Sequence, residues 1–115
     1  MSIDRKVIIA SMSEDPETIC ECVAEFAPSA RADLTAITMA VVARNAKSVQ
    51  RASHSLKGSA ALLGAYELQR RCDELERSAE GCDWTLIQAL ASKVGPVLME
   101  VEQALDTFVK QLGVA

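Results

Sequence analysis

Apolar residues recur at intervals of three and four along most of this chain, the period of helices that bury one face. The first clear helix start is Asp15 followed by Pro16, because an aspartate caps free N–H groups and proline is tolerated at the first helical position. Pro28 lies inside the next apolar run and is expected to interrupt it. The sequence therefore predicts a short helix between these points, with three residues on its apolar face: Ile19, Val23 and Phe26.

The middle of the chain contains three further helix patterns. The next helix is expected to end near Arg44, and its apolar face contains Ala30, Leu34, Ile37 and Val41. Asn45 is a suitable cap for a helix over about 46–63, and Gly64 is a natural C-terminal stop. A fourth helix is predicted over about 65–79, ending at Gly81, with an inward face of Leu68, Cys72, Leu75 and Ala79.

The last segment begins at a third capping residue, Asp83. Gly95-Pro96 resembles a break, since Pro96 removes the hydrogen bond to the carbonyl of Ser92 and crowds it. One apolar seam nevertheless stays in phase across this point: Ile87, Val94, Leu98, Val101, Leu105, Phe108 and Leu112. We therefore expect a kinked helix, or two nearly collinear helices, over 83–112. Residues before 14 are expected to form a short helix across the bundle end through Ile3, Val7 and Ile8.

Short connections between these helices predict an all-α fold. Loops of one to four residues place sequential helices antiparallel, and amphipathic helices of this length bury their apolar faces together. We expect an antiparallel up-down four-helix bundle, with an extra short N-terminal helix and a kinked last helix. The chain of 115 residues is expected to be a single domain over 1–115, with a bundle core over about 28–112. Its 50% hydrophobic and 3% aromatic composition suits close-packed helices better than a sheet.

Charge and composition argue against several functions. A net charge of −4, with no basic stripe, argues against nucleic acid as a partner. No apolar run approaches the roughly 20 residues of a membrane span, and the N-terminus lacks the pattern of a signal peptide. We expect a soluble cytoplasmic protein, with no membrane partner.

The four cysteines are expected to be free thiols with structural roles. Cys20 and Cys22 are two residues apart, so on a helix they point about 200° away from each other and cannot hold one metal ion together. Cys72 falls on an apolar stripe, and Cys82 is near a turn. Since no CxxC pair or set of histidine ligands is present, no metal site and no cofactor are expected.

The single histidine, His54, is the strongest candidate for chemistry. On a helix it lies opposite the apolar stripe, so it is expected on the exposed face. Its neighbours one turn later are Lys57 and Gly58, and a glycine inside a helix costs roughly 1 kcal/mol relative to alanine. An exposed imidazole beside a bare patch indicates that another molecule must approach the ring.

Three interpretations of His54 compete. A buried, hydrogen-bonded histidine is disfavoured by the helical phase. A surface histidine without a role is the default for an isolated residue, but Lys57 and Gly58 in register argue against it. The third is a nucleophile or phosphate carrier, because neutral imidazole has a free nitrogen lone pair near neutral pH and Lys57 can lie beside the resulting phosphate.

The residues around His54 closely resemble the signature of histidine-containing phosphotransfer (HPt) domains. His54-Ser55-Leu56-Lys57-Gly58-Ser59 is similar to the family pattern His-x-Leu-Lys-Gly-Ser, with Ser53 where the family often has alanine. Matching positions then follow in order: Leu63-Gly64-Ala65, Leu68, Cys72 and Leu75-Glu76. The resemblance is sharpest over 52–76 and extends in architecture over about 15–112. It implies the four-helix bundle already expected from the loops.

The resemblance implies a phosphocarrier in a two-component phosphorelay. His54 would accept a phosphoryl group from the aspartate of a receiver domain, in a hybrid sensor kinase or a response regulator, and pass it to another receiver. The chain has no P-loop, no GxGxxG motif and no acidic cluster suited to Mg²⁺, so no ATP site and no kinase activity of its own are expected. A monomer is expected.

Glu76 is the candidate partner of the His54 ring. His54 lies ten residues before Gly64 and Glu76 twelve after, so at 1.5 Å per residue both reach about the same height on adjacent helices. A carboxylate there could accept a hydrogen bond from one ring nitrogen and leave the other free, a role that Glu or Gln has in the family. The alternative is that Glu76 is merely solvated, as the other charges of its helix are expected to be: Glu67, Arg70, Arg71, Asp73 and Glu74.

The docking surface is expected to follow the exposed stripe around His54. Its members, with Glu76 at the edge, are Lys47, Gln50, Arg51, His54, Ser55, Lys57, Gly58 and Ala61. The alternative function from another class is a helical adaptor that binds receiver domains or a kinase through the same face without carrying phosphate. A third, an enzyme with His54 as general base, lacks the set of polar residues that would build a pocket.

Overall fold

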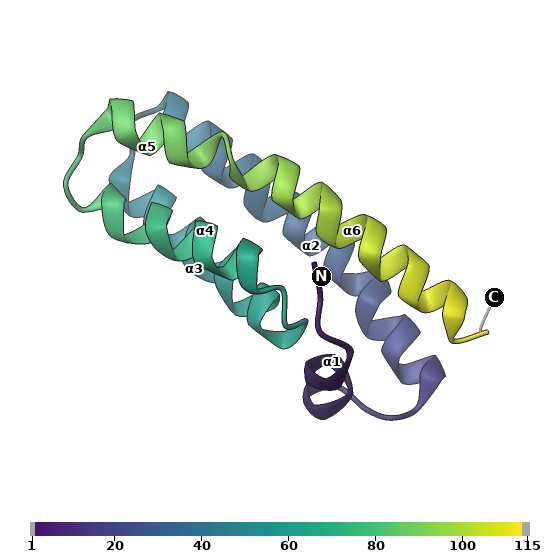
Figure 1. Cartoon of the computed structure of the whole chain (residues 1–115). Coiled ribbons are helices and arrows are strands. Elements are labelled where there is room, and N and C mark those ends of the chain that lie inside the picture. The colour runs from purple at the N-terminus through teal and green to yellow at the C-terminus, as the bar shows by residue number, and fades with distance from the viewer. Residues whose placement is uncertain (1, 114–115) are drawn as a thin grey trace.

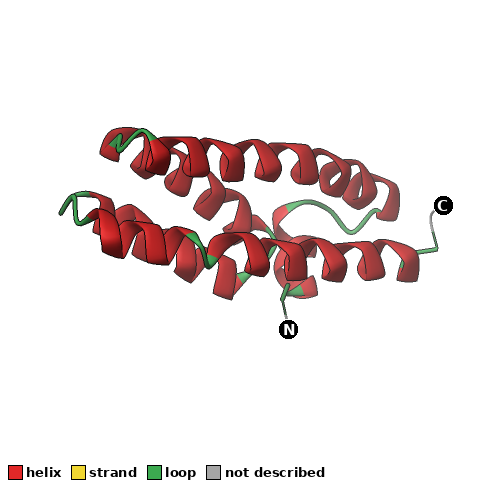
Figure 2. Ribbon diagram, turned by 90° about the horizontal axis from the view of Figure 1, so that it is seen from above, coloured by secondary structure: helices red, strands yellow, loops and turns green. Residues whose placement is uncertain are grey.

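A computed structural model describes residues 2–113, and all regular structure in this part of the chain is helical (Figure 2). The molecule is elongated, with principal extents of 46 × 20 × 19 Å. Long helices run side by side, and one short helix lies across the end of the bundle (Figure 1). The helices are α1 Arg5–Ser11, α2 Pro16–Val42, α3 Ala46–Leu62, α4 Tyr66–Ala79, α5 Trp84–Ala91 and α6 Val94–Gln111.

Three of the helices begin at the caps that the sequence predicts. The side chain of Asp15 accepts a hydrogen bond from the backbone N–H of Thr18, and Asp83 does the same for Leu86. Asn45 accepts from the N–H of Ser48 at 3.1 Å, which starts the helix that carries His54. Each cap satisfies one of the free donors of a first helical turn, so these boundaries are determined locally.

The predicted interruption at Pro28 is wrong, because α2 continues through it from Pro16 to Val42. Pro28 is exposed, so solvent can hydrate the carbonyl that loses its N–H partner. Buried residues on both sides, such as Phe26 and Ala30, keep one face in phase against the core. Packing of both halves therefore outweighs the loss of one hydrogen bond.

The expected break in the last segment is present, and it precedes Gly95-Pro96. Helix α5 ends at Ala91, and α6 begins at Val94 after a turn at Ser92 and Lys93. Pro96 thus lies in the first turn of α6, where a missing N–H costs little. The two helices follow one another along the bundle and together form its fourth member (Figure 1).

Helices α3 and α4 form a tight hairpin around Gly64, which has φ of +61°. A side chain at this position would collide with Asp4, whose backbone N–H donates to the carbonyl of Leu63 at 3.0 Å. The N-terminal segment therefore closes this end of the hairpin, with Ile3 and Ile8 buried, as expected. At the other end of α4 the left-handed residue is Cys82, with φ of +53°, and Gly81 has no positive φ.

The core has the order expected of an up-down bundle. Helix α3 packs between α2 and α4, and α5 and α6 complete the ring by packing against both α2 and α4. The buried positions of α3 are Val49, Ala52, Ser53, Leu56 and Ala60. Its opposite side is therefore the exposed face that carries His54. Within the described residues, no helix combines the length and apolarity needed to cross a membrane.

Candidate functional site

His54 extends from the middle of α3 into solvent, and its side chain is 71% exposed. Its helical neighbours Ser53 and Leu56 are buried, because they lie on the opposite, core-facing side of the same turn. The interpretation of His54 as a core histidine is therefore wrong. The ring is open to any molecule that approaches this face of the bundle.

Glu76 comes from α4 and contacts one nitrogen of this ring. Its Oε2 lies 3.1 Å from Nδ1 of His54, as expected from the equal heights of the two residues on the hairpin. With Nδ1 protonated and donating to the carboxylate, Nε2 keeps its lone pair, and no side chain within residues 2–113 forms a hydrogen bond or ion pair with it. The contact both orients the ring and selects the nitrogen that is available for chemistry.

Lys57 joins the same carboxylate from one turn further along α3. Its Nζ lies 2.6 Å from Oε1 of Glu76 and 3.3 Å from Oδ1 of Asp73. The hydrogen bond from Lys57 is the main cause that lowers the pKa of Glu76. The same hydrogen bond is the main cause that raises the pKa of Lys57. Glu76 is therefore ionised at neutral pH and able to accept a hydrogen bond from His54.

The remaining residues of the predicted docking stripe follow the outer side of α3. Lys47, Arg51, Gly58 and Ala61 are exposed, while Gln50 is half-buried. A Cβ atom at Gly58 would meet nothing within 4 Å, so the glycine is not required by packing inside the chain. A shallow hollow of about 330 Å³ beside the ring is lined by Gln50, Arg51, His54, Ser55 and Glu76.

Two carboxylates of this site were not anticipated as participants. From the sequence, Asp73 is expected to be a solvated charge, yet Asp73 contacts Lys57. Its position three residues before Glu76, on the same helical face, is the signal in the sequence. Asp33 of α2 accepts a hydrogen bond from the hydroxyl of Ser55 at 2.9 Å, which ties the site to a third helix. No sequence spacing relates Asp33 to Ser55, because the pairing depends on how α2 packs against α3.

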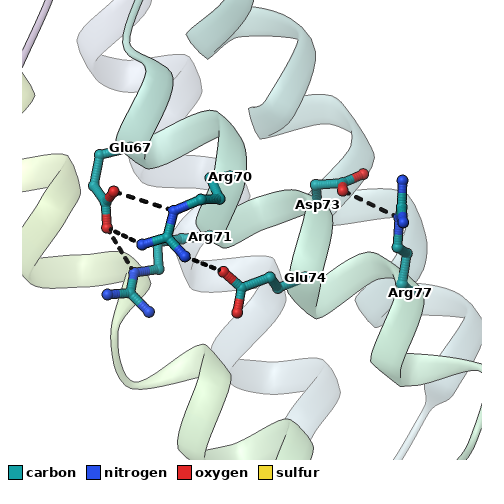
Figure 3. A network of polar contacts seen from close by, with 6 residues as sticks. All are labelled: Glu67, Arg70, Arg71, Asp73, Glu74 and Arg77. Atoms are coloured by element: carbon teal, nitrogen blue, oxygen red, sulfur yellow. Dashed lines mark hydrogen bonds and ion pairs between the residues drawn. The ribbon is translucent and has the colours of Figure 1, made fainter.

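The other charges of α4 form pairs within their own helix, as Figure 3 shows. Glu67 accepts hydrogen bonds from both Arg70 and Arg71, and Arg70 also contacts Glu74 at 2.6 Å. These pairs are three or four residues apart and largely exposed, so they contribute little to stability. None of these pairs includes Glu76, whose carboxylate contacts His54 and Lys57 of α3.

The thiol of Cys72 is buried near the charged side chains of this site. All four cysteines are free, and burial raises the pKa of Cys72 to about 12, which keeps its thiol protonated. Over residues 2–113, no group of three histidine, cysteine, aspartate or glutamate side chains is arranged to hold a metal ion. The groups available for chemistry at the site are therefore an imidazole, an ammonium and carboxylates.

Comparison with known proteins agrees with this geometry. The model of the Hpt domain family matches residues 21–112, which is most of the chain. The chain therefore belongs to the Hpt domain family, and its role is histidine phosphotransfer in two-component signalling.

A solved structure shares the fold. It is the crystal structure of histidine-containing phosphotransfer protein B (HptB) from Pseudomonas aeruginosa PAO1, similar with a TM-score of 0.87 and 21% identity over 96% of both chains. No curated protein sequence gives a significant match.

Proposed function

We propose that His54 is the residue that carries the phosphoryl group, and that it does so through Nε2. The observation that carries the proposal is the contact of 3.1 Å between Nδ1 and Glu76 on a ring that is 71% exposed. This contact occupies one nitrogen and leaves the other available. The space above Gly58, one turn further along α3, is open, so a partner can approach the ring. Imidazole in this state is a competent nucleophile at neutral pH.

The transfer proceeds by attack of the Nε2 lone pair on the phosphorus of an aspartyl phosphate in a receiver domain. The P–Nε2 bond forms as the P–O bond to the aspartate breaks, and the receiver's carboxylate leaves with the electron pair. The ring becomes positively charged, and the nearby carboxylate of Glu76 stabilises this charge through the Nδ1 proton. In the return step a receiver carboxylate attacks phosphorus and the electrons of the P–N bond return to Nε2.

Lys57 supports the same reaction electrostatically. Its ammonium lies one turn from His54 and is held by Glu76 at 2.6 Å. A cation at this distance can pair with the oxygens of a phosphoryl group bound to the ring, which lowers the electrostatic cost of placing that group near Glu76 and Asp73. Lys57 is therefore expected to affect phosphoryl transfer more than docking.

The docking surface in this proposal is the exposed stripe of α3 centred on His54. Its contact should be small and transient, at or below about 1,200 Å² in total, because a relay protein must release each partner. The receiver supplies Mg²⁺ and its own acidic pocket, and the chain acts as a monomeric, single-domain phosphocarrier in the cytoplasm without an ATP site of its own. The stripe contains small and polar residues, which suit a contact that must separate again.

The test is labelling of the wild-type chain and of His54→Gln by a phosphorylated receiver domain. Wild type should acquire acid-labile, base-stable phosphate, and His54→Gln should acquire none while keeping its helical circular dichroism and thermal unfolding. Receiver binding measured on the same variant separates this function from the adaptor alternative. Normal labelling of His54→Gln would refute phosphate transfer through His54.

A further inference from the structure

Lys57 is shared between two carboxylates of α4, and only one of them contacts the histidine. Glu76 bridges Lys57 and His54, whereas Asp73 contacts Lys57 through Oδ1 and no atom of the ring. Asp73 and Glu76 are three residues apart on α4, and His54 and Lys57 are three apart on α3, so each pair is separated by roughly 4.5 Å along its helix. Because the helices are antiparallel, Asp73 faces the level of Lys57 and Glu76 faces the level of His54.

Asp73 also contacts a second cation, Arg77. Its Oδ2 lies 3.1 Å from Nε of Arg77, the pair drawn at one side of Figure 3, while its Oδ1 remains for Lys57. The side chain of Arg77 is 81% exposed, so this pair is weak and solvent-screened. Lys57 is 25% exposed, so the position of its ammonium depends more on the two carboxylates than on solvent.

We propose that Asp73 is a positioning residue that competes with the phosphoryl group on His54 for the ammonium of Lys57. The inference rests on the proposed function, in which His54 carries the phosphoryl group. When Nε2 is phosphorylated, Lys57 has three anionic groups within reach of its flexible side chain, and Asp73 draws it along α4 away from the ring. Asp73 therefore limits how strongly Lys57 stabilises phosphohistidine, and keeps the group ready for release.

Loss of the Asp73 charge should consequently prolong the life of phospho-His54. Spontaneous loss occurs when water attacks phosphorus and the P–N bond breaks. The electron pair of that bond returns to Nε2, and orthophosphate leaves with the hydrogens of the attacking water. Ion pairing between Lys57 and the phosphoryl oxygens stabilises the phosphorylated state against this reaction. In Asp73→Asn one of the two carboxylates that compete for the lysine is gone and Glu76 remains, so Lys57 pairs more often with the phosphoryl group. Hydrolysis should then slow by about threefold, the effect expected of one exposed ion pair.

The experiment uses the full chain phosphorylated by phosphoramidate, whose ammonia is displaced from phosphorus by Nε2, so that no docking partner is needed. Loss of phospho-His54 is followed by ³¹P NMR in wild type, Asp73→Asn and the matched control Glu74→Gln. Glu74 neighbours Asp73, has a similar side-chain exposure (37% against 34%) and contacts Arg70 instead of Lys57. Asp73→Asn should slow hydrolysis, and Glu74→Gln should leave it unchanged.

Two further variants separate positioning from general effects of charge or structure. Asp73→Glu restores the carboxylate and should return hydrolysis toward the wild-type rate. In a Lys57→Ala background, Asp73→Asn should have no further effect, because the residue acts through the lysine. Equal thermal unfolding of Asp73→Asn and Glu74→Gln, with unequal hydrolysis, would show that the effect is not one of stability.

The outcomes distinguish this inference from the proposed function. Wild-type protein that takes no label on His54 refutes both. Wild-type protein that is labelled, with Asp73→Asn behaving like Glu74→Gln, refutes only the role of Asp73. Slowing that persists without Lys57 also refutes it, since it would show that Asp73 acts directly on the phosphoryl group.

Discussion

The outward faces of α3 and α4 lie side by side on one hairpin and use their charges differently. On α4, Glu67, Arg70 and Glu74 contact one another within a single helix. On α3, the side chains of His54 and Lys57 form their hydrogen bonds and ion pairs with carboxylates of α4 and, within the described residues, with none of their own helix. Further along the exposed face of α3 are Gly58, which has no side chain, and Ala61, which has only a methyl group, so no long side chain covers these two positions.

The difference shows what each kind of pairing can do. A pair within one exposed helix satisfies its charges locally and contributes about 0.3–0.5 kcal/mol to helix stability. A pair between helices holds a side chain at a chosen position relative to another element, as Glu76 does for the ring of His54. Charges that cross between helices are therefore the ones expected to matter for phosphoryl transfer.

The largest effect on phosphoryl transfer should come from replacing a glutamate of α4 that contacts α3, compared with a glutamate that contacts only α4. Glu76→Ala removes the carboxylate that orients the ring, and should lower the rate of phosphoryl acceptance from a receiver domain by about tenfold, the value of one charge-assisted hydrogen bond. Glu67→Ala, which breaks only contacts within α4, should leave that rate unchanged. Equal rates in the two variants would remove the distinction.

The second prediction concerns a long side chain placed on the exposed face of α3, where Gly58 has none. Gly58→Gln should stabilise the fold by about 0.5–1 kcal/mol through helix propensity, since nothing lies within 4 Å of the new Cβ. It should also slow transfer severalfold, because the side chain occupies the space that a receiver needs. Gly95→Ala on α6 is the control for replacing a helical glycine far from His54: it should leave transfer unaffected, and apart from adjacent residues the nearest atom to its new Cβ belongs to Leu34 at 3.8 Å. Unimpaired transfer in Gly58→Gln would show that the bare patch does not serve the partner.

A third prediction concerns the buried side of α3, next to His54. Ser53 is fully buried, and its hydroxyl has no hydrogen-bond partner among residues 2–113, so it is desolvated without compensation. Ser53→Ala should therefore raise the free energy of unfolding by about 1 kcal/mol, measured by urea denaturation, with transfer unchanged. Destabilisation by this substitution would show that the hydroxyl is satisfied in solution.

The smallest effect should come from a pair within α4, and it depends on pH. Hydrogen bonds from Arg70 are the main cause that lowers the pKa of Glu67 from 4.5, so its contribution to stability is present above that value and is lost as pH falls through the lowered pKa. The melting temperature of Glu67→Gln should lie slightly below that of wild type at pH 7, and the difference should disappear on acidification to about pH 3. A difference that grows in acid would contradict the assignment.

The sequence by itself determined most of the helices and the exposed position of His54. Caps such as Asp15 and Asn45, the stop at Gly64 and the apolar period act within a few residues, so they can be read without the fold. The exposure of His54 follows from the same period, as does its level relative to Glu76 across a hairpin of known length.

Tertiary structure decided what depends on packing between distant segments. Pro28 is accommodated inside α2 because both halves of that helix are buried against the core, which no local rule reports. The pairing of Ser55 with Asp33 depends on the rotation and height of α2 against α3. The pairing of Lys57 with Asp73 depends on how far the long lysine side chain reaches toward α4. Local rules specify where a helix begins and which face it buries, whereas these contacts arise only when buried faces fix the relative positions of the helices.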